Sequence, residues 1–191
     1  MKDQIRILGI DDGAFKFSDP STPVVGVVMR LPTYVEGVMV TEVTVDGELD
    51  ATEKLETMIA ESRYLDQLKL IILDGAALGG FNVVNIERLH DRLGVPIATV
   101  TRDEPNFEEI EAALKKHFED WELRLAMMRK VEIKRFETEH NPIYISRVGI
   151  GDRELKEILD KSTIKGALPE VLRVAHLIAT AISKGESRGR A

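Results

Sequence analysis

The sequence predicts a single α/β domain with a mixed sheet and helices on both of its faces. Three observations lead to this prediction. Strand-like segments at 5–10, 24–29 and 34–45 follow one another with short breaks, as in an antiparallel meander. After residue 50, helical and strand-like segments alternate, which is typical of strands joined through helices. Residues 68–73 form a nearly continuous apolar run, as expected for a strand buried on both faces.

The second half of the chain supplies the alternating elements. A helix is expected from Ala51, and the buried strand ends on Asp74-Gly75. Further along, we expect helices over 84–93, 107–117 and 169–183, helical spacing throughout 120–136, and strands over 96–100 and 142–148. The strands after the meander are expected to be parallel. No repeat or linker divides the chain, so 1–191 is expected to be one domain, with a flexible polar tail at 184–191.

Composition excludes several classes of site. The chain has no cysteine, which excludes disulfides, zinc thiolate sites and cysteine nucleophiles, and its four histidines do not cluster. Any metal site must therefore use oxygen ligands, which favours Mg²⁺ or Mn²⁺. No apolar stretch is long enough to span a bilayer, and no signal peptide opens the chain, so we expect a cytoplasmic protein without a membrane partner.

Net charge bears on the partner. With 26 basic and 33 acidic residues, the chain carries a formal charge of −7. Proteins that hold a phosphate backbone through bulk electrostatics are usually basic, so this balance counts against nucleic acid. Contacts depend on local patches, however, and basic residues concentrate between 124 and 135. That segment is either a phosphate-tracking patch or a solvated helix face.

Carboxylates at strand ends are the most informative feature. Asp11 follows the first strand, Asp74 follows the most buried strand, and Asp50 follows the third. Side chains just past the carboxyl ends of neighbouring strands converge in one crevice of an α/β sheet. Carboxylates gathered there repel one another unless a cation bridges them or one takes up a proton. Asp11, Asp50 and Asp74 are therefore candidate ligands for two Mg²⁺ or Mn²⁺ ions in phosphodiester hydrolysis.

A structural explanation competes with this one. Asp-Gly is a common turn signal, and the chain contains it at 12–13, 46–47 and 74–75. An aspartate close to a helix start, such as Asp50, is usually a cap.

The segment after Asp74 supplies candidate substrate contacts. Its small residues Gly75, Gly79 and Gly80 would let a nucleotide backbone approach closely, although the segment lacks the spacing of a P-loop. Phe81 would stack on a base or pack in the core. Arg102 would contact a phosphate or form a surface ion pair.

Several segments resemble endonuclease V. Residues 69–75 (Lys-Leu-Ile-Ile-Leu-Asp-Gly) and 93–100 (Leu-Gly-Val-Pro-Ile-Ala-Thr-Val) are similar to its Val-Asp-Gly strand and Gly-Val-Pro-Thr-Ile segment. Residues 8–13 resemble its first strand, and 168–177 its closing Pro-Glu-x-x-Arg-x-Ala-His helix. Order and spacing hold over most of the chain. More narrowly, the chain looks like an archaeal family related to endonuclease V.

The resemblance implies a ribonuclease H-like fold and Mg²⁺-dependent cleavage of nucleic acid near deaminated bases. By position, Asp11 and Asp74 match two metal-binding carboxylates, and Asp50 lies about where the family has a glutamate. His176 matches a histidine near the site, although a half-buried packing role is the alternative.

The chain also departs from the family pattern. The Pro-Tyr-Ile-Pro wedge of endonuclease V is missing from 44–49, its His-Gly is replaced by Ala76-Ala77, and its Ala-Lys by Thr101-Arg102. The metal carboxylates match while the base-recognition parts differ. We therefore expect a substrate other than inosine in duplex DNA.

Three functions follow as hypotheses. The first is a Mg²⁺-dependent endonuclease acting on DNA or RNA at deaminated or damaged bases, in which water is the nucleophile and His176 or Arg102 assists. The second is a non-catalytic nucleic-acid-binding module that has the same fold. The third is a protein-interaction domain. The sequence does not decide whether the nucleic acid is DNA or RNA, or whether the protein is a monomer or a homo-oligomer.

Overall fold

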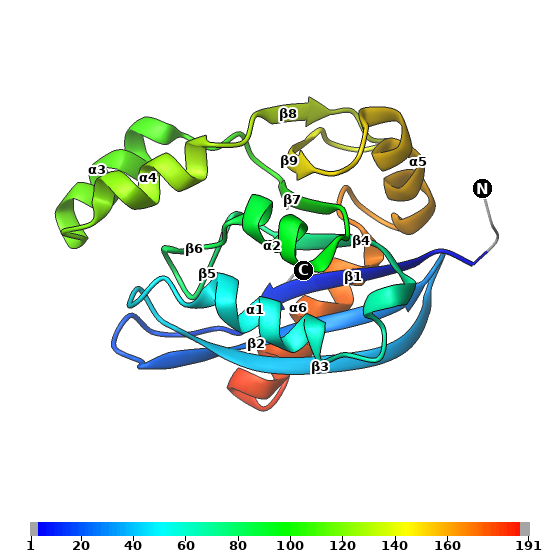
Figure 1. Cartoon of the computed structure of the whole chain (residues 1–191), viewed down its shortest axis with the longest axis horizontal. Helices are drawn as coiled ribbons and strands as arrows, with labels where there is room; N and C mark the ends of the chain where they lie inside the picture. The colour runs from blue at the N-terminus through cyan, green and yellow to red at the C-terminus, as the bar shows by residue number, and fades with distance from the viewer. Residues whose placement is uncertain (1–3, 188–191) are drawn as a thin grey trace.

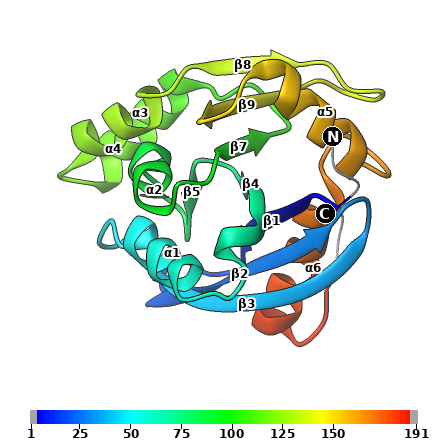
Figure 2. The ribbon, with the colours of Figure 1, turned by 45° about the vertical axis from the view of Figure 1, so that its right-hand side comes forward.

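The computed structural model describes residues 4–187, and within them one seven-stranded mixed sheet forms the centre (Figure 1). In the order in which they lie, its strands are β3 (Tyr34–Thr44), β2 (Ser21–Arg30), β1 (Arg6–Asp12), β4 (Leu68–Asp74), β7 (Ile97–Thr101), β9 (Ile143–Val148) and β8 (Ile133–Phe136). A small hairpin of β5 (Ala77–Leu78) and β6 (Asn82–Val83) follows β4. Figure 2 shows the large sheet curving from β3 at the bottom to β8 at the top.

The strand directions confirm the predicted meander. β1 pairs antiparallel with β2, and β2 with β3. β4 lies parallel to β1, and β7 lies parallel to β4, so the carboxyl ends of these three strands share one edge of the sheet. The expectation of parallel strands throughout the second half is wrong for β8 and β9. β9 runs antiparallel to β7 and forms a hairpin with β8, because only a short connection separates those two strands.

Helices cover both faces of the sheet, as predicted. The structure has α1 (Ala51–Ala60), a short 3₁₀ turn (Leu65–Gln67), α2 (Ile86–Leu93), α3 (Phe107–His117), α4 (Trp121–Arg129), α5 (Asp152–Ser162) and α6 (Glu170–Lys184). α1 and α2 pack on one face, and α5 and α6 on the other. α3 and α4 form a hairpin that extends away from the sheet (Figure 1). Among the described residues, no helix combines the length and the apolar content that crossing a bilayer requires.

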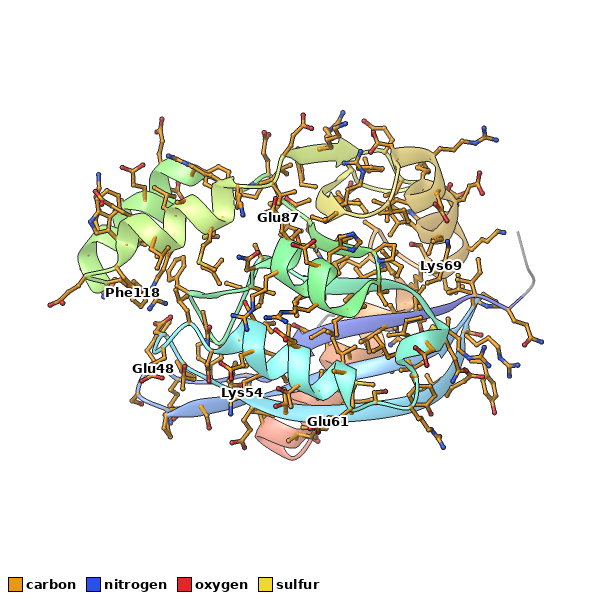
Figure 3. All side chains as sticks on the ribbon, viewed as in Figure 1. Glu48, Lys54, Glu61, Lys69, Glu87 and Phe118 are labelled. Atoms are coloured by element: carbon orange, nitrogen blue, oxygen red, sulfur yellow. The ribbon has the colours of Figure 1, made fainter. Side chains whose placement is uncertain are left out.

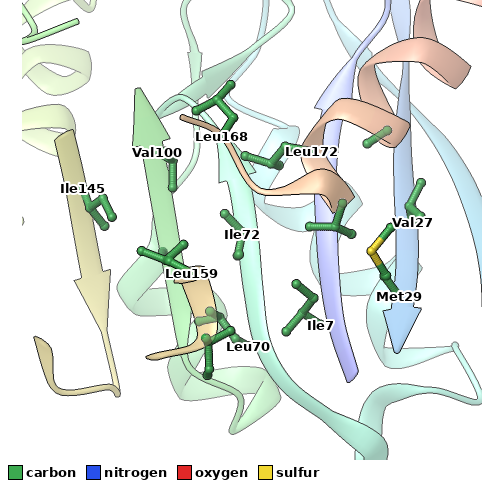
Figure 4. Close-up of a cluster of buried hydrophobic side chains, with 14 of the residues drawn as sticks. Ile7, Val27, Met29, Leu70, Ile72, Val100, Ile145, Leu159, Leu168 and Leu172 are labelled. Atoms are coloured by element: carbon green, nitrogen blue, oxygen red, sulfur yellow. The ribbon is translucent and has the colours of Figure 1, made fainter. Parts of the chain in front are cut away.

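Two hydrophobic layers hold these elements together. Leu70 and Ile72 of β4 belong to the layer under α5 and α6, which Figure 4 shows with Leu159 and Leu172. The intervening Ile71 of β4 packs instead toward α1 and α2. Side chains alternate across a strand, so a strand covered on both faces needs apolar residues at every position. This explains the uninterrupted apolar run in β4.

Local signals account for the helix ends. The Asn85 side chain accepts a hydrogen bond from the backbone N–H of Arg88 and caps α2, and Asn106 caps α3 in the same way. Gly94 ends α2 in the left-handed conformation, with φ of 67°.

Three expectations need correction or completion. Helical spacing over 120–136 is realised only as far as Arg129, and residues 133–136 form β8, because pairing with β9 at the sheet edge outweighs local periodicity. Helix α5 was not predicted. Of the expected tail, Lys184 belongs to α6 and Gly185 caps it, while 188–191 lie outside the described residues.

Candidate functional site

The carboxyl edge of the sheet brings Asp11 and Asp74 together. Asp11 lies at the end of β1, and Asp74 ends β4 opposite Val100 of β7. Alternation along the strands puts Asp11 on the same side as Ile7, and Asp74 on the same side as Ile72. Both isoleucines face α5 and α6, so both carboxylates emerge beside α6.

A close approach between α6 and β1 places His176. A Cβ atom on Gly9 would lie only 2.7 Å from Cγ1 of Val171, so glycine lets the helix sit directly on the strand. From Val171 to His176 the helix advances by five residues, and from Gly9 to Asp11 the strand advances by two. Both steps span about 7 Å. His176 therefore reaches the level of Asp11, where its Nδ1 lies 2.8 Å from Oδ2 of that aspartate.

Burial and like charges dominate the electrostatics. Asp11 is only 5% exposed, and burial, followed by the negative charges of Asp74 and Asp12, raises its pKa to about 8. Burial also raises the pKa of Asp74, while the positive charges of Arg102 and His176 act in the opposite direction. Arg102 lies just past the end of β7 and lowers the pKa of Asp11 as well. One exposed guanidinium thus opposes the repulsion between a buried and a half-buried carboxylate.

The donor set fits a hard divalent cation. Asp11 and Asp74 present carboxylate oxygens, which are the ligands that Mg²⁺ and Mn²⁺ prefer. Their raised pKa values show that the folded protein disfavours two unscreened negative charges here, and a cation would relieve that cost. Within residues 4–187, however, no three histidine, aspartate or glutamate side chains are grouped closely enough to hold one ion.

The structure does not bring Asp50 into this group. Its Oδ1 accepts hydrogen bonds from Thr44 Oγ1 at 2.9 Å and from Asn82 Nδ2 at 2.5 Å. It precedes α1 without a side-chain capping bond. The Asp50 carboxylate makes no capping bond, because neighbouring donors on β3 and β6 turn it toward themselves. Its predicted role as a metal ligand stays a prediction.

The glycines after β4 shape a loop that closes on β1. Gly75, Gly79 and Gly80 all have positive φ, and the backbone N–H of Gly79 donates to Oδ2 of Asp12. A Cβ atom on Gly80 would collide with Asp46 Oδ1 at 2.1 Å. These glycines are needed for backbone geometry. Their predicted contact with substrate stays a prediction.

Phe81 has partners within the fold. Its ring packs edge-on against Phe118, with centroids 5.8 Å apart, and its backbone N–H donates to Asp46. These contacts agree with the packing alternative, and the stacking of Phe81 on a base stays a prediction.

The segment at 124–135 is not a free basic patch. Arg124 is buried, and Arg129, Lys130, Lys134 and Arg135 each pair with a glutamate or an aspartate.

Sequence analysis did not identify two residues with long-range contacts, one next to the site and one beside Asp50. Asp12 follows Asp11 directly and accepts from the Gly79 backbone, but its Asp-Gly context indicated only a turn. Asn82 is fully buried and joins β6 to Asp50 and Ala51. Its partners are 31 or more residues away, so no local signal could have identified it.

Comparison with solved structures defines the class of protein. Endonuclease V from Ciona intestinalis, in complex with a 24mer DNA containing an inosine followed by a ribo-adenosine, has a TM-score of 0.60 at 14% identity. That match covers 90% of this chain and 83% of the other. Human endonuclease V has a TM-score of 0.56 at 14% identity, covering 90% and 81%. The chain therefore has the ribonuclease H-like fold of endonuclease V.

Sequence comparison gives the family. The family model of endonuclease dU matches residues 3–183, and the chain belongs to this family. A UPF0215 protein of Methanosarcina acetivorans is 48% identical, covering all of this chain and 97% of the relative. A crystal structure from Archaeoglobus fulgidus, described as a protein of unknown function, has a TM-score of 0.83 at 40% identity and covers 93% and 98%. The predicted archaeal relationship to endonuclease V is confirmed.

Proposed function

We propose that this protein is a divalent-metal-dependent endonuclease that hydrolyses a phosphodiester bond in nucleic acid. The observation that carries the proposal is the contact between Asp11 and His176 beside Asp74, at the carboxyl edge of three adjacent parallel strands. A buried and a half-buried carboxylate with raised pKa values, gathered with a histidine and an arginine, are typical of a site that binds a cation and an anionic substrate. Membership of the endonuclease dU family supports the same conclusion.

Each residue has a distinct part in this scheme. Asp11 and Asp74 would hold Mg²⁺ or Mn²⁺, which supplies an activated water and stabilises charge on the departing oxygen. His176 directs Nδ1 to Asp11, and its Nε2 is left to exchange a proton with solvent or substrate. Arg102 offers a guanidinium to a phosphate oxygen, which also offsets the repulsion between that phosphate and the carboxylates.

A deaminated base is the proposed recognition element. The family is described by deoxyuridine, and the Ciona endonuclease V was solved on DNA containing inosine. Because this chain lacks the wedge and the His-Gly pair of endonuclease V, deoxyuridine is the first substrate to test and deoxyinosine the second.

The test is cleavage of oligonucleotides that carry one deoxyuridine, one deoxyinosine or no lesion. In Mg²⁺, the unmodified chain should cut a lesion strand, and Asp74→Asn should lower the rate at least about 100-fold without lowering the melting temperature. Asp91→Asn makes the same chemical change at an exposed position on α2 and should cut normally. An unchanged rate in Asp74→Asn overturns the assignment.

Asp50→Asn tests whether that residue is a metal ligand or a structural residue. If Asp50 only secures Asn82 and Thr44, its loss should lower the melting temperature and reduce cleavage modestly. Loss of cleavage as complete as in Asp74→Asn, with the fold intact, would support Asp50 as a ligand.

Calorimetric titration with Mn²⁺ distinguishes the metal-dependent nuclease from the non-catalytic nucleic-acid-binding module. A metal-dependent nuclease should bind Mn²⁺ in a way that Asp11→Asn abolishes, whereas a pure binding module needs no cation site. Binding of DNA without Mn²⁺ binding would favour the module.

A further inference from the structure

The loop between β1 and β2 carries an aromatic side chain that the fold does not cover. Phe17 is 77% exposed, which is more than any other large hydrophobic side chain in the described chain. It contacts the ring of Phe15 edge-on, with centroids 5.8 Å apart and planes at 82°. An edge-on contact with a single ring leaves most of the Phe17 surface in water, so core packing does not explain this residue.

The loop is ordered by hydrogen bonds rather than by apolar contacts. The backbone N–H of Lys16 donates to Asp19 Oδ2 at 2.7 Å, and the N–H of Asp19 donates to the Lys16 carbonyl at 2.9 Å. Phe17 lies inside this closed turn. At the loop base, Thr22 Oγ1 donates to the carbonyl of Gly13. The backbone that carries the exposed ring is therefore ordered before any ligand arrives, which lowers the entropic cost of binding.

The loop adjoins the candidate site. It begins one residue after Asp12, whose neighbour Asp11 contacts His176. Two lysines bring positive charge to this region. Lys16 lies between the two phenylalanines in the sequence. Lys184 follows Ser183, which lies against Gly13 at the base of the loop. An exposed aromatic ring packed against a second, half-buried ring, with a cation beside the candidate site, matches how proteins hold unpaired nucleotides.

We propose that Phe15 and Phe17 form a platform on which one unpaired nucleobase stacks while the adjoining phosphate lies toward Asp11. The proposal rests on the proposed function for its ligand class. The occupant is a base rather than a protein, because two neighbouring rings with a lysine between them offer far less than the contiguous apolar area of a protein interface. A base needs only an accessible ring face and a cation for its phosphate.

The experiment measures binding of a labelled single-stranded DNA by the full chain carrying Asp74→Asn, so that no cleavage intervenes. In this background, Phe17→Ala and Phe17→Leu should each weaken binding about 10-fold, within the range for loss of one base–aromatic stack. Phe17→Trp should bind as tightly as phenylalanine. Lys16→Gln should reduce the salt dependence of binding by about one phosphate contact.

Tyr34→Ala is the matched control. Tyr34 is also an exposed aromatic, at 60%, and stacks with Arg30 at the opposite end of β2 and β3. Its loss should leave binding unchanged. Binding that survives Phe17→Leu would indicate a generic apolar contact, and equal losses in Tyr34→Ala a nonspecific surface effect; either overturns the platform.

Cleavage assays on the otherwise unmodified chain separate the two proposals. If the unmodified chain cuts and Phe17→Ala binds and cuts equally well, the platform is overturned and the nuclease assignment stands. If nothing is cut but Phe17→Ala loses binding, the platform stands and the nuclease assignment is overturned. No binding of single-stranded DNA by the unmodified chain overturns the platform.

Discussion

Asp11 sits where the folded chain opposes its ionisation. It is almost fully buried, and the carboxylates of Asp74 and Asp12 lie close enough to raise its pKa further. Arg102 and the backbone N–H of Asp12 offset only part of this effect, since the pKa remains about 8. A cation that bound at Asp11 would have to displace this proton.

This state predicts how stability depends on pH. Asp11 has an ordinary pKa of 3.8 and a folded pKa of about 8, so between these values the folded chain binds more protons than the unfolded chain. Stability therefore falls as pH rises from about 4 to about 8, and the raised pKa of Asp74 acts in the same direction. One pKa unit corresponds to about 1.4 kcal/mol, so we expect a loss of at least about 2 kcal/mol between pH 5 and pH 8.

Urea denaturation at the two pH values, with a chelator present, measures this loss. Asp11→Asn should remove much of the pH dependence and be more stable than the unmodified chain at pH 8. A pH profile that is the same in both proteins would show that Asp11 ionises normally. Added Mn²⁺ should restore stability at pH 8 in the unmodified chain but not in Asp11→Asn.

Among single residues, those at strand ends were predictable. Asp11 and Asp74 follow apolar runs, and His176 lies in a segment that resembles the endonuclease V helix. Asp12 and Asn82 were not, since their bonds are to Gly79 and Asp50, which are distant in sequence.

At the scale of elements, the packing of α6 on β1 decides where His176 stands. Gly9→Ala would place a Cβ atom against Val171 and push the helix outward. Overpacking of this kind costs about 1–3 kcal/mol. We expect a lower melting temperature and slower cleavage, because His176 would move away from Asp11.

Gly151→Ala is the control for this change. Gly151 has φ of −82° and open space around its Cβ position, so alanine should be tolerated. Equal effects of both substitutions on cleavage would argue against the view that Gly9 positions His176 by letting α6 pack closely on β1.

The elements that sequence analysis missed share one cause. Residues 133–136 become a strand because β9 offers a hydrogen-bonding edge, although the preceding residues have helical spacing. Helix α5 is amphipathic, and its Leu155 and Ile158 gain their partner only when the sheet forms. Both outcomes depend on surfaces supplied by distant segments.

At the scale of the whole molecule, Arg124 joins the α3–α4 hairpin to the loops near the site. Its Nη1 donates to the Phe81 carbonyl at 2.8 Å and its Nη2 to the Gly47 carbonyl at 2.7 Å. Its guanidinium also stacks on Phe118, which Figure 3 shows at the same end of the molecule as Glu48. The hairpin extends beyond the sheet, so this buried residue is a principal attachment.

Arg124→Met should release the hairpin. It leaves two carbonyls without their donor, at a cost of about 1–3 kcal/mol each if they stay buried. Amide hydrogen exchange should accelerate in α3 and α4 more than in the central strands. Arg153→Met makes the same change at an exposed position on α5, where the arginine pairs with Glu157 of the same helix, and should leave exchange in the hairpin near normal. Uniform acceleration across the sheet would mean that Arg124 supports the entire fold.

The sequence by itself determined the fold class, the antiparallel meander and the identity of the strand-end carboxylates, because periodicity and apolar runs are local properties of the chain. Only the tertiary structure decided which acids meet. It paired Asp11 with His176, placed Asp12 in the cluster and turned Asp50 toward Asn82. Hydrogen bonds between segments far apart in sequence set these positions, and local patterning carries no record of them.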